Sequence, residues 1–543
     1  MTMARFRELF GFGGAPRTRA ERIWRTGLFF LWLAIVLILI SRHVMWRDEV
    51  RGLSLAIQGD NIWEMLVRLR GEGHPALWYL LLRSAHALFP VPQVLAVMAA
   101  LVGIAAMVLL TWRSPFRPIV IALMLASGFG LYTFVVMARN YGITMLILFA
   151  IAAVYRRYSD RGLVLALLVF LLCNTNAHSL ILAGGFLIFW FFDLVSEHGF
   201  WGTLRRPSFL AGGVALIAGA AACYWEVSIP VQDAVMTPQQ AAENRGFLPL
   251  LRDLLLPGIP FAPLVWGGLW SNLLLSLLCW LALAGLSGRP GTFLAALAVQ
   301  SGMILLFHVV YPAAYRHAAL FLVFLIFLYW LAAEGHGGQR RTTEGKRRNE
   351  ALGCAAMLVL LAIQMPMGIA EAKRLIGGEP ESSSAALGEV IKRRGLEHAI
   401  ILGDPDYHLE AMPYYVPNPT YFVRESRFGR VVQFSSKAKF HVELSDILAR
   451  AQQLRAAHRR PVIVTLADRI DPNQPATIRS KGYVWTLRTD PAQVRAFLHA
   501  TCRLARLDNA TTDETYDVYL LPLGGISAAP TACGSGSKAA SRG

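Results

Sequence analysis

Long apolar runs recur along the first 370 residues of this chain, and they constrain its fold more than any other feature. The runs have the length that a helix needs to cross a hydrocarbon core of ~30 Å. Hydrophobic residues make up 55% of the sequence and charged residues only 16%, and the mean hydropathy is +0.46. The sequence therefore predicts a polytopic α-helical membrane protein, with about 11–13 transmembrane helices.

The first apolar run, from Gly27 to Ser41, has a basic flank like that of a secretory signal peptide. No small-x-small cleavage site follows it, and Ser41 leads through Arg42 and His43 straight into an acidic loop. We interpret this run as an uncleaved transmembrane helix.

The distribution of Lys and Arg predicts how the helices are oriented, because basic loops stay in the cytoplasm. The net charge of +17 comes mainly from helix ends and short loops, so it reports topology and makes a nucleic-acid partner improbable. Predicted cytoplasmic segments are the N-terminus, 113–117, 156–161, 205–206, 287–289 and 340–348. The opposite face then holds Asp48, Arg139, His178, the loop from Ser228 to Arg252, and Arg316.

About eleven crossings fit the length rule, and an odd number places the C-terminal region outside the cytoplasm. The predicted spans are 27–44, 91–112, 117–138, 141–156, 162–177, 180–196, 209–227, 269–287, 292–311, 314–333 and 351–370. The segment from His74 to Phe89 has two interpretations. Either it is a re-entrant or interfacial helix, as Arg83 and His86 within it favour, or it spans and the segment from Leu248 to Trp266 spans too. The sequence leaves both open.

After Met367 the composition changes to alternating strand-like and helical patterns, which predict a separate α/β domain. Strands are expected at 398–402, 461–466 and 516–521, and a helix at 445–458. The predicted organisation is a cytoplasmic basic N-terminus (1–26), a membrane module (27–370) with a catalytic outer loop (45–75), an extracytoplasmic α/β domain (371–523), and a flexible tail (524–543). No phosphate-binding loop of the G-x-x-x-x-G-K-[ST] type is present, which argues against nucleotide hydrolysis.

The six cysteines give no zinc-binding C-x-x-C pair. Cys173, Cys223, Cys279 and Cys354 lie in apolar runs, where a small buried side chain is the simplest interpretation. If the C-terminal domain lies outside the cytoplasm, Cys502 and Cys533 could form a disulfide there.

Polar residues interrupt the apolar pattern at several points that the charge rule places on one face. They are Trp46-Arg47-Asp48-Glu49, Gly73-His74-Pro75, Ala138-Arg139-Asn140-Tyr141, Tyr311-Pro312 with Tyr315-Arg316-His317, and the group Asn174, Asn176 and His178. Arginine binds phosphate oxygens bidentately, and a lipid phosphate lies at this depth. Each motif alone also fits a structural role: a solvated acidic pair, arginines anchored at the interface, or hydrogen bonds that join helices. Their placement on one face favours a site.

These motifs resemble those of the polyprenyl-phosphate-sugar-dependent glycosyltransferases of the C-type fold. The matching residues are Asp48 and Glu49 after the first transmembrane helix, the His74-Pro75-Ala76-Leu77-Trp78-Tyr79-Leu80 helix start, and Arg139-Asn140-Tyr141 at a later helix boundary. The likeness is greatest to the bacterial branch with lipopolysaccharide galacturonosyltransferases, aminoarabinose transferases and protein O-mannosyltransferases. It covers residues 25–335. Near Arg139 the branch carries further charges, whereas residues 134–138 here carry none.

The resemblance implies transfer of a sugar from a polyprenyl-phosphate donor to a glycan, lipid or protein acceptor, with inversion at the anomeric carbon. Asp48 would be the base and Glu49 would assist it, while Arg139 and Arg316 would hold the lipid phosphate. Further binding candidates are His74, Tyr141, Asn176, His178 and His317. No cofactor and no metal ligand is predicted, although a divalent metal stays open. The implied location is a bacterial inner membrane, with the site and the C-terminal domain in the periplasm. The alternatives are a transporter or lipid flippase of the envelope, and a polysaccharide polymerase or ligase.

Overall fold

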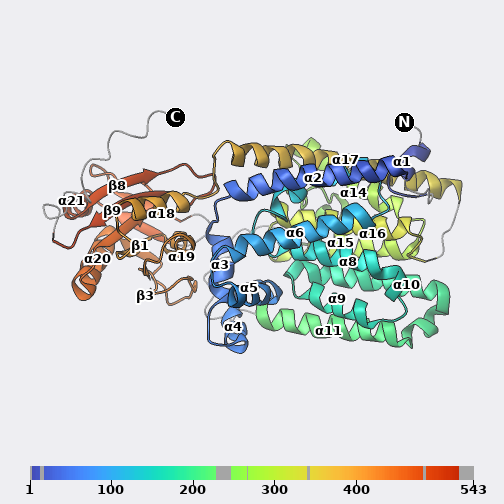
Figure 1. The fold of residues 1–543 in the computed structure, drawn as a ribbon, viewed down its shortest axis with the longest axis horizontal. Helices are drawn as coiled ribbons and strands as arrows, with labels where there is room; N and C mark the ends of the chain where they lie inside the picture. Colours follow the sequence, from blue (N-terminus) through green and yellow to red (C-terminus); the bar gives the residue numbers. More distant parts are fainter. Residues whose placement is uncertain are drawn as a thin grey trace.

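The computed structural model describes residues 3–12, 18–227, 246–265, 267–338, 343–480 and 485–524. Figure 1 shows a helical bundle whose long helices run side by side, with a smaller domain of strands and helices beyond one end of it. The N-terminus lies at the other end of the bundle. Cys533 and most of the loop between Ser228 and Arg252 lie outside the described residues, whereas Cys502 is disulfide-bonded.

The bundle contains most of the helices of the described residues. They are α1 (Met3–Leu9), α2 (Arg19–Arg42), α6 (Val94–Arg113), α7 (Pro118–Leu125), η1 (Phe129–Thr133), α8 (Tyr141–Tyr158), α9 (Leu163–Cys173), α10 (Ala177–Leu204), α11 (Pro207–Val227), α14 (Leu269–Gly285), α15 (Pro290–Val309), α16 (Tyr315–Ala333) and α17 (Glu344–Ile376). The shorter helices of this part of the chain are α3 (Arg47–Ala56), α4 (Ile62–Leu69), α5 (Leu77–Leu88), α13 (Phe247–Leu255) and η2 (Ala262–Leu264).

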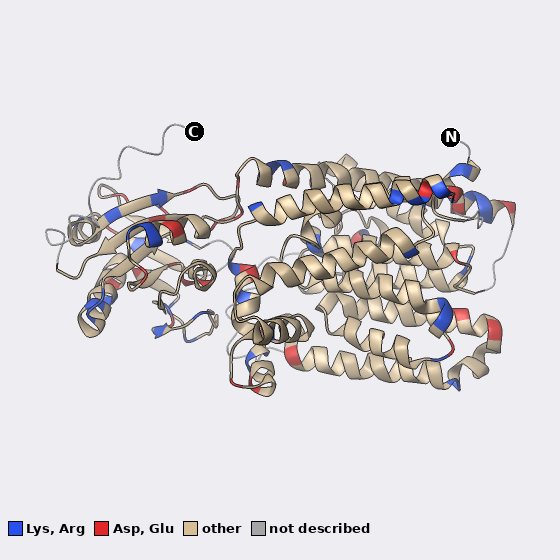
Figure 2. Cartoon of the chain, in the orientation of Figure 1, with Lys and Arg blue, Asp and Glu red and all other residues tan. Residues whose placement is uncertain are grey.

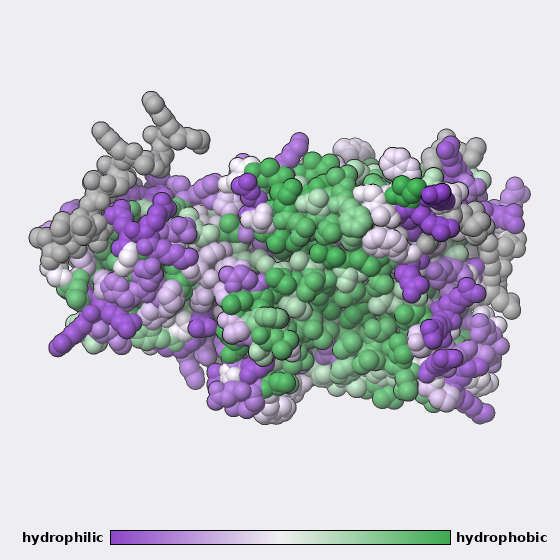
Figure 3. Space-filling model, in the orientation of Figure 1, coloured by the Kyte–Doolittle hydropathy of each residue, from purple (hydrophilic) through white to green (hydrophobic). Residues whose placement is uncertain are grey.

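The predicted membrane character of the bundle is confirmed. Seven helices of the described part are long and apolar enough to cross a membrane: α2, α6, α10, α11, α15, α16 and α17. Two more apolar helices, α9 and α14, are shorter. Figure 3 shows a broad hydrophobic band across the visible face of the bundle, with hydrophilic surface at both ends. Buried within this band, α16 is apolar on all sides, as expected of a central membrane helix.

The basic segments assigned to one face do gather at one end of the bundle. The backbone N–H of Arg117 donates to the carbonyl of Leu9 at 2.8 Å, and Arg206 pairs with Asp160 at 2.8 Å. Figure 2 shows Lys and Arg concentrated at the end where the N-terminus lies, and again where the bundle meets the C-terminal domain. The C-terminal domain is therefore on the face opposite to the basic N-terminus.

The segment from His74 to Phe89 forms only the 12-residue helix α5. At ~1.5 Å per residue it is too short to cross a bilayer, and it packs against α3 and α6. The segment from Leu248 to Trp266 is likewise broken into α13 and η2. Of the two interpretations left open by the sequence, the structure favours an interfacial position for α5.

The prediction of one continuous helix over 117–138 is wrong. The α-helix α7 ends at Leu125, and η1 follows as a π-helical turn. Ser127 Oγ donates to the carbonyl of Met124 and accepts from the N–H of Gly130. A Cβ on Gly130 would lie only 2.1 Å from the Met124 carbonyl oxygen, so this turn needs glycine. Because the helix ends early, residues 134–140 form a non-helical segment at the end of the bundle near the C-terminal domain, and this segment carries Arg139.

The C-terminal domain has a mixed six-stranded sheet in the order β3-β2-β1-β5-β9-β8 and a small sheet in the order β4-β7-β6. An apolar cluster lies on each face of the six-stranded sheet. One cluster includes residues of α18, and the other includes residues of α20 and α21. Its elements are α18 (Ser384–Arg393), β1 (Ile400–Asp404), η3 (Asp406–Ala411), α19 (Met412–Tyr415), β2 (Thr420–Phe422), β3 (Arg427–Phe428), β4 (His441–Glu443), α20 (Leu444–His458), β5 (Val462–Leu466), β6 (Ala476–Arg479), β7 (Thr486–Thr489), α21 (Pro491–Ala500), β8 (Cys502–Leu507) and β9 (Tyr516–Leu521). The predicted α/β character is confirmed.

The domain meets the bundle mainly through α3, against which η3 packs. Tyr415 Oη donates to the carbonyl of Met45 at 2.7 Å, and Glu381 contacts Tyr132 and Arg374 of the bundle. As a result, the outer loop that carries Asp48 lies between the membrane helices and the C-terminal domain.

Candidate active site

Asp48 is in the first turn of α3, directly after the chain leaves the bundle. Its side chain is 30% exposed, and its Oδ2 lies 3.3 Å from Nη1 of Arg139. Its Oδ1 lies 3.9 Å from Nε of Arg47. Burial alone would raise the pKa of the Asp48 carboxyl, but the charges of Arg139, Arg47, Arg316 and Arg51 outweigh it and hold that pKa below its ordinary value. Asp48 is therefore an ionised carboxylate that solvent can reach.

Arg139 joins Asp48 to His74. Its Nη1 donates to the backbone carbonyl of Asp48 at 2.7 Å, and its Nη2 lies 3.0 Å from Nε2 of His74. Arginine can only donate, so His74 Nε2 accepts and the ring carries its proton on Nδ1. Burial, together with the charges of Arg139 and Arg316, lowers the pKa of His74 to about 3. His74 is thus a neutral residue that orients Arg139.

A second group of predicted residues lies where α16, α8 and α10 begin. Arg316 Nε donates to Tyr141 Oη at 3.3 Å, and Tyr141 Oη lies 3.0 Å from His317 Nε2. The rings of His317 and His178 are stacked at 4.6 Å, and His178 Nε2 lies 2.9 Å from Tyr311 Oη. The charge of Arg316 acts on both Asp48 and His74. The two groups therefore belong to one site.

Arg316 differs from the other arginines around Asp48. Within the described part of the chain its only hydrogen bond is the one to Tyr141, and no carboxylate pairs with it. Each of the other three arginines forms an ion pair: Arg139 with Asp48, Arg47 with Asp513, and Arg51 with Glu72. A buried or half-buried cation normally has an anionic partner, so Arg316 is available to an anionic ligand.

Glu49 is fully buried and does not share the position of its neighbour Asp48. Its carboxylate accepts from the N–H groups of Trp46 at 3.1 Å and Ala138 at 2.5 Å, and contacts His43 Nε2 at 2.9 Å. Burial would lower the pKa of His43, but Glu49 and Glu381 outweigh it and raise the pKa to about 10. Glu49 thus holds the start of α3 against the segment that carries Arg139, and its oxygens are used within the protein.

Asn176 also serves the structure. It caps α10, because its Oδ1 accepts from the N–H of Ser179 at 3.0 Å. Its Nδ2 donates to Thr144 Oγ1 at 2.8 Å, and Thr144 also contacts Thr175 and Ser179. The structure therefore brings together Asp48, His74, Arg139, Tyr141, His178, Arg316 and His317, but gives Asn176 the role of joining helices.

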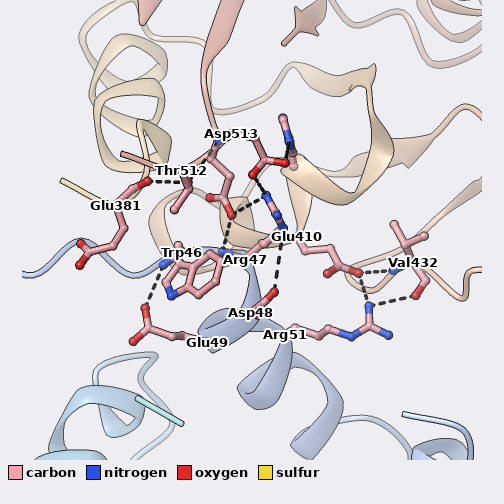
Figure 4. A network of polar contacts seen from close by, with 12 residues as sticks. Trp46, Arg47, Asp48, Glu49, Arg51, Glu381, Glu410, Val432, Thr512 and Asp513 are labelled. Atoms are coloured by element: carbon pink, nitrogen blue, oxygen red, sulfur yellow. Dashed lines mark hydrogen bonds and ion pairs between the residues drawn. The ribbon is translucent and has the colours of Figure 1, made fainter. Parts of the chain in front are cut away.

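Sequence reasoning missed the residues that surround α3. Arg51 pairs with Glu72 through two contacts of 2.6 Å and also contacts Glu410 of the C-terminal domain. Figure 4 shows Arg47 between Asp513 on one side and Asp48 on the other. Arg47 and Arg51 stand four residues apart, which places them on one face of α3, and Asp48 is three residues before Arg51. Their acidic partners could not be found, because most of them lie more than 350 residues away in the sequence.

Among the described residues, the group with a geometry that could hold a metal ion is Asp160, Glu197 and His198. It lies at the opposite end of the bundle from Asp48, and Arg206 contacts both Asp160 and His198. An arginine in this position supplies the positive charge that a metal would supply. This group has no connection with the site around Asp48.

No family model matches this chain, and no curated protein matches it either. Two solved structures are similar to it, both of ArnT from Cupriavidus metallidurans. The structure bound to undecaprenyl phosphate is 12% identical with a TM-score of 0.44, and covers 91% of this chain and 98% of ArnT. The apo structure is 13% identical with a TM-score of 0.46, and covers 92% and 98%. At these values the likeness concerns the course of the backbone alone.

Proposed function

We propose that this protein is a membrane glycosyltransferase that moves a sugar from a polyprenyl-phosphate donor to an acceptor on the face where the C-terminal domain lies. The observation that carries the proposal is that an accessible carboxylate, Asp48, and a cation, Arg316, belong to one site, and that Arg316 has no carboxylate partner among the described residues. The two lie at the end of an apolar bundle, where a lipid phosphate would be.

The proposed reaction needs one base and one site for a leaving phosphate. Asp48 takes the proton from an acceptor hydroxyl, whose oxygen then attacks the anomeric carbon of the donor. The bond from that carbon to the phosphate oxygen breaks, and the lipid phosphate departs with the electron pair. Arg316 and Arg139 stabilise its charge. Because attack and departure occur on opposite sides of the anomeric carbon, the configuration at that carbon is inverted in the product.

Several features support the phosphate position. The helices α8, α10 and α16 begin at residues 141, 177 and 315, so their N-terminal ends, which favour anions, all lie on the site face. Tyr141 fixes the guanidinium of Arg316 through Nε and leaves its two Nη groups to face a ligand. His178 and His317 extend the polar surface with neutral donors or acceptors for a sugar. Glycans, lipids such as lipopolysaccharide, and proteins are the proposed acceptor classes.

A direct test uses purified protein, sugars linked to undecaprenyl phosphate, and membranes from a strain that lacks the gene as the source of acceptor. We expect labelled sugar to move to the acceptor while free undecaprenyl phosphate is released. Movement of intact donor between leaflets, with no cleavage of the sugar–phosphate bond, would instead indicate a flippase. A ladder of products with many added sugars would indicate a polymerase.

The proposal also fixes an orientation, with the site and the C-terminal domain in the periplasm of a bacterial inner-membrane protein. A reporter that fluoresces only in the cytoplasm, fused after residue 380, should be dark, because α17 ends at Ile376 and the chain then enters the domain. The same reporter fused after Arg206, at the basic end of the bundle, is the matched control and should be bright. The reverse pattern would place the site in the cytoplasm and contradict the proposal.

A further inference from the structure

The N-cap side chain of α3 does not cap the helix, although Glu49 in its first turn accepts from the N–H of Trp46. The residue at its N-cap position is Trp46, whose indole has no oxygen to accept from the first free N–H groups. The backbone N–H of Arg47 is instead satisfied by Glu514 of the C-terminal domain, whose Oε1 lies 3.0 Å away. The two residues are 467 positions apart in the sequence. A distant domain thus completes the helix that carries Asp48.

The same carboxylate also binds the side chain of Arg47. Nη1 of Arg47 lies 3.2 Å from Oε1 of Glu514 and 2.7 Å from Oδ1 of Asp513. Figure 4 shows Asp513 and Asp48 on either side of the Arg47 guanidinium. The position of Arg47 therefore depends on the C-terminal domain, and the next residue in the chain is Asp48.

Glu514 is itself held firmly. Its side chain is fully buried, its Oε2 accepts from Ser384 Oγ at 3.3 Å, and its backbone carbonyl accepts from the N–H of Ser383 at 3.0 Å. The segment before it is fixed too, since Thr512 Oγ1 donates to the carbonyl of Glu381 at 2.6 Å. A buried carboxylate with fixed partners on both oxygens is well suited to set the position of a helix end.

The rest of α3 is tied to the same domain. Arg51 Nη1 donates to the carbonyl of Val432 at 3.0 Å and contacts Glu410, as Figure 4 shows. On the bundle side, Arg139 bonds the carbonyl of Asp48 at 2.7 Å and its carboxylate at 3.3 Å. The carboxylate of Asp48 is therefore placed by two opposed sets of contacts, one from the bundle and one from the C-terminal domain.

We propose that Glu514 is a positioning residue for Asp48: by capping α3 and holding Arg47, the C-terminal domain sets where the Asp48 carboxylate stands relative to Arg139. This deepens the proposed function, on which it rests. Reactions of this kind lose rate steeply when a reacting group moves by about 1 Å, even if substrate binding is intact. The function of the C-terminal domain is then to hold the site in its active geometry.

The experiment compares three variants of the full-length protein. Glu514→Ala removes both the cap and the charge, whereas Glu514→Gln keeps an oxygen that can accept from the Arg47 N–H. Glu397→Gln removes an exposed carboxylate of the same domain and is the matched control. Each variant is measured for kcat and for the KM of the lipid donor, and for amide hydrogen exchange of residues 46–51 and of the strands β1, β5 and β9.

We expect Glu514→Ala to lower kcat by about tenfold or more with little change in donor KM, and to speed exchange at 46–51 but not in the strands. Glu514→Gln should lie between Ala and the wild type, because it keeps one oxygen that can accept from the Arg47 N–H but replaces the other oxygen by an NH2 group. Glu397→Gln should resemble the wild type in both measurements.

Two results would overturn the proposal. One is unchanged exchange at 46–51 in Glu514→Ala, which would show that the cap does not hold the helix. The other is faster exchange there with a normal kcat, which would show that the helix end does not position the base. The exchange measurement needs no substrate, so it is independent of the proposed reaction. Normal turnover by Asp48→Asn would reject the base assignment while the exchange result still decides the role of Glu514 as a cap.

Discussion

Replacing Asp48 by asparagine should lower kcat by about a hundredfold or more, the usual scale for loss of a general base. An amide has the shape of the carboxylate but cannot take a proton from the acceptor hydroxyl. The fold should be kept, because Arg139 still binds the backbone carbonyl of residue 48 and Nε2 of His74. The measurement is transfer from the lipid-linked sugar, with the thermal midpoint as a check on folding.

The ratio of wild-type to Asp48→Asn activity should not change between about pH 8 and about pH 5. The pKa of Asp48 is lowered below the ordinary value of about 3.9, so the carboxylate is ionised over this whole range. A lowered folded-state pKa also means that the ionised carboxylate stabilises the folded protein. This stabilisation is present above the unfolded-state pKa and is lost as the pH falls through the folded-state pKa.

The matched control for this variant is Asp60→Asn, which removes an exposed carboxylate from the same outer loop. It should transfer sugar at the wild-type rate. Full activity in a folded Asp48→Asn protein would show that another group is the base. An activity ratio that fell toward one near pH 6 would show that Asp48 is not ionised as its arginine neighbours imply.

Replacing Arg316 should weaken the use of the donor more than the use of the acceptor. Arg316→Ala removes a charged hydrogen-bond donor from the phosphate, which corresponds to a loss of about a hundredfold in kcat/KM for the donor. Arg316→Lys keeps the charge but loses the planar fork, and about a tenfold rise in donor KM is expected. The acceptor KM should be unchanged in both. Steady-state kinetics with each substrate varied in turn give these values.

Two further variants separate a phosphate site from an anchor at the membrane surface. Tyr141→Phe removes the hydroxyl that orients Arg316 and should raise the donor KM by a smaller factor than Arg316→Lys. Arg205→Lys changes an exposed arginine at the other end of the bundle and should have no effect. If Arg316→Lys and Arg316→Ala both kept the wild-type donor KM, Arg316 would be an anchor and the phosphate would be held elsewhere.

Much of the architecture could be predicted because the bilayer imposes simple rules on sequence. Each predicted span contains helix, and the strand at 516–521 is β9. The span at 117–138 failed for a local reason: the π-helical turn brings Gly130 against the Met124 carbonyl, where no side chain fits, and hydropathy does not register this. The same break puts the N–H of Ala138 within reach of Glu49.

The two acidic neighbours show where sequence reasoning about the site ends. Asp48 and Glu49 are adjacent and chemically alike, so the motif predicts that both serve the reaction. On a helix, successive side chains point about 100° apart, and here one faces Arg139 while the other is buried against His43 and Ala138. Which of the two is accessible depends on packing between segments that are distant in the chain, and no local pattern encodes it.

The contact between Arg47 and Glu514 can form only late in the synthesis of the chain. Polypeptides are made from the N-terminus at roughly 5–20 residues per second, so the 467 residues between the two partners correspond to about 25–90 seconds of synthesis. Throughout that interval the bundle can insert and pack, but the N–H of Arg47 lacks its Glu514 acceptor and the Arg47 guanidinium lacks its acidic partners from the C-terminal domain. On the proposal that Glu514 positions Asp48, we expect Asp48 to reach its final position only after residue 514 has been made, and we expect shorter chains to be inactive.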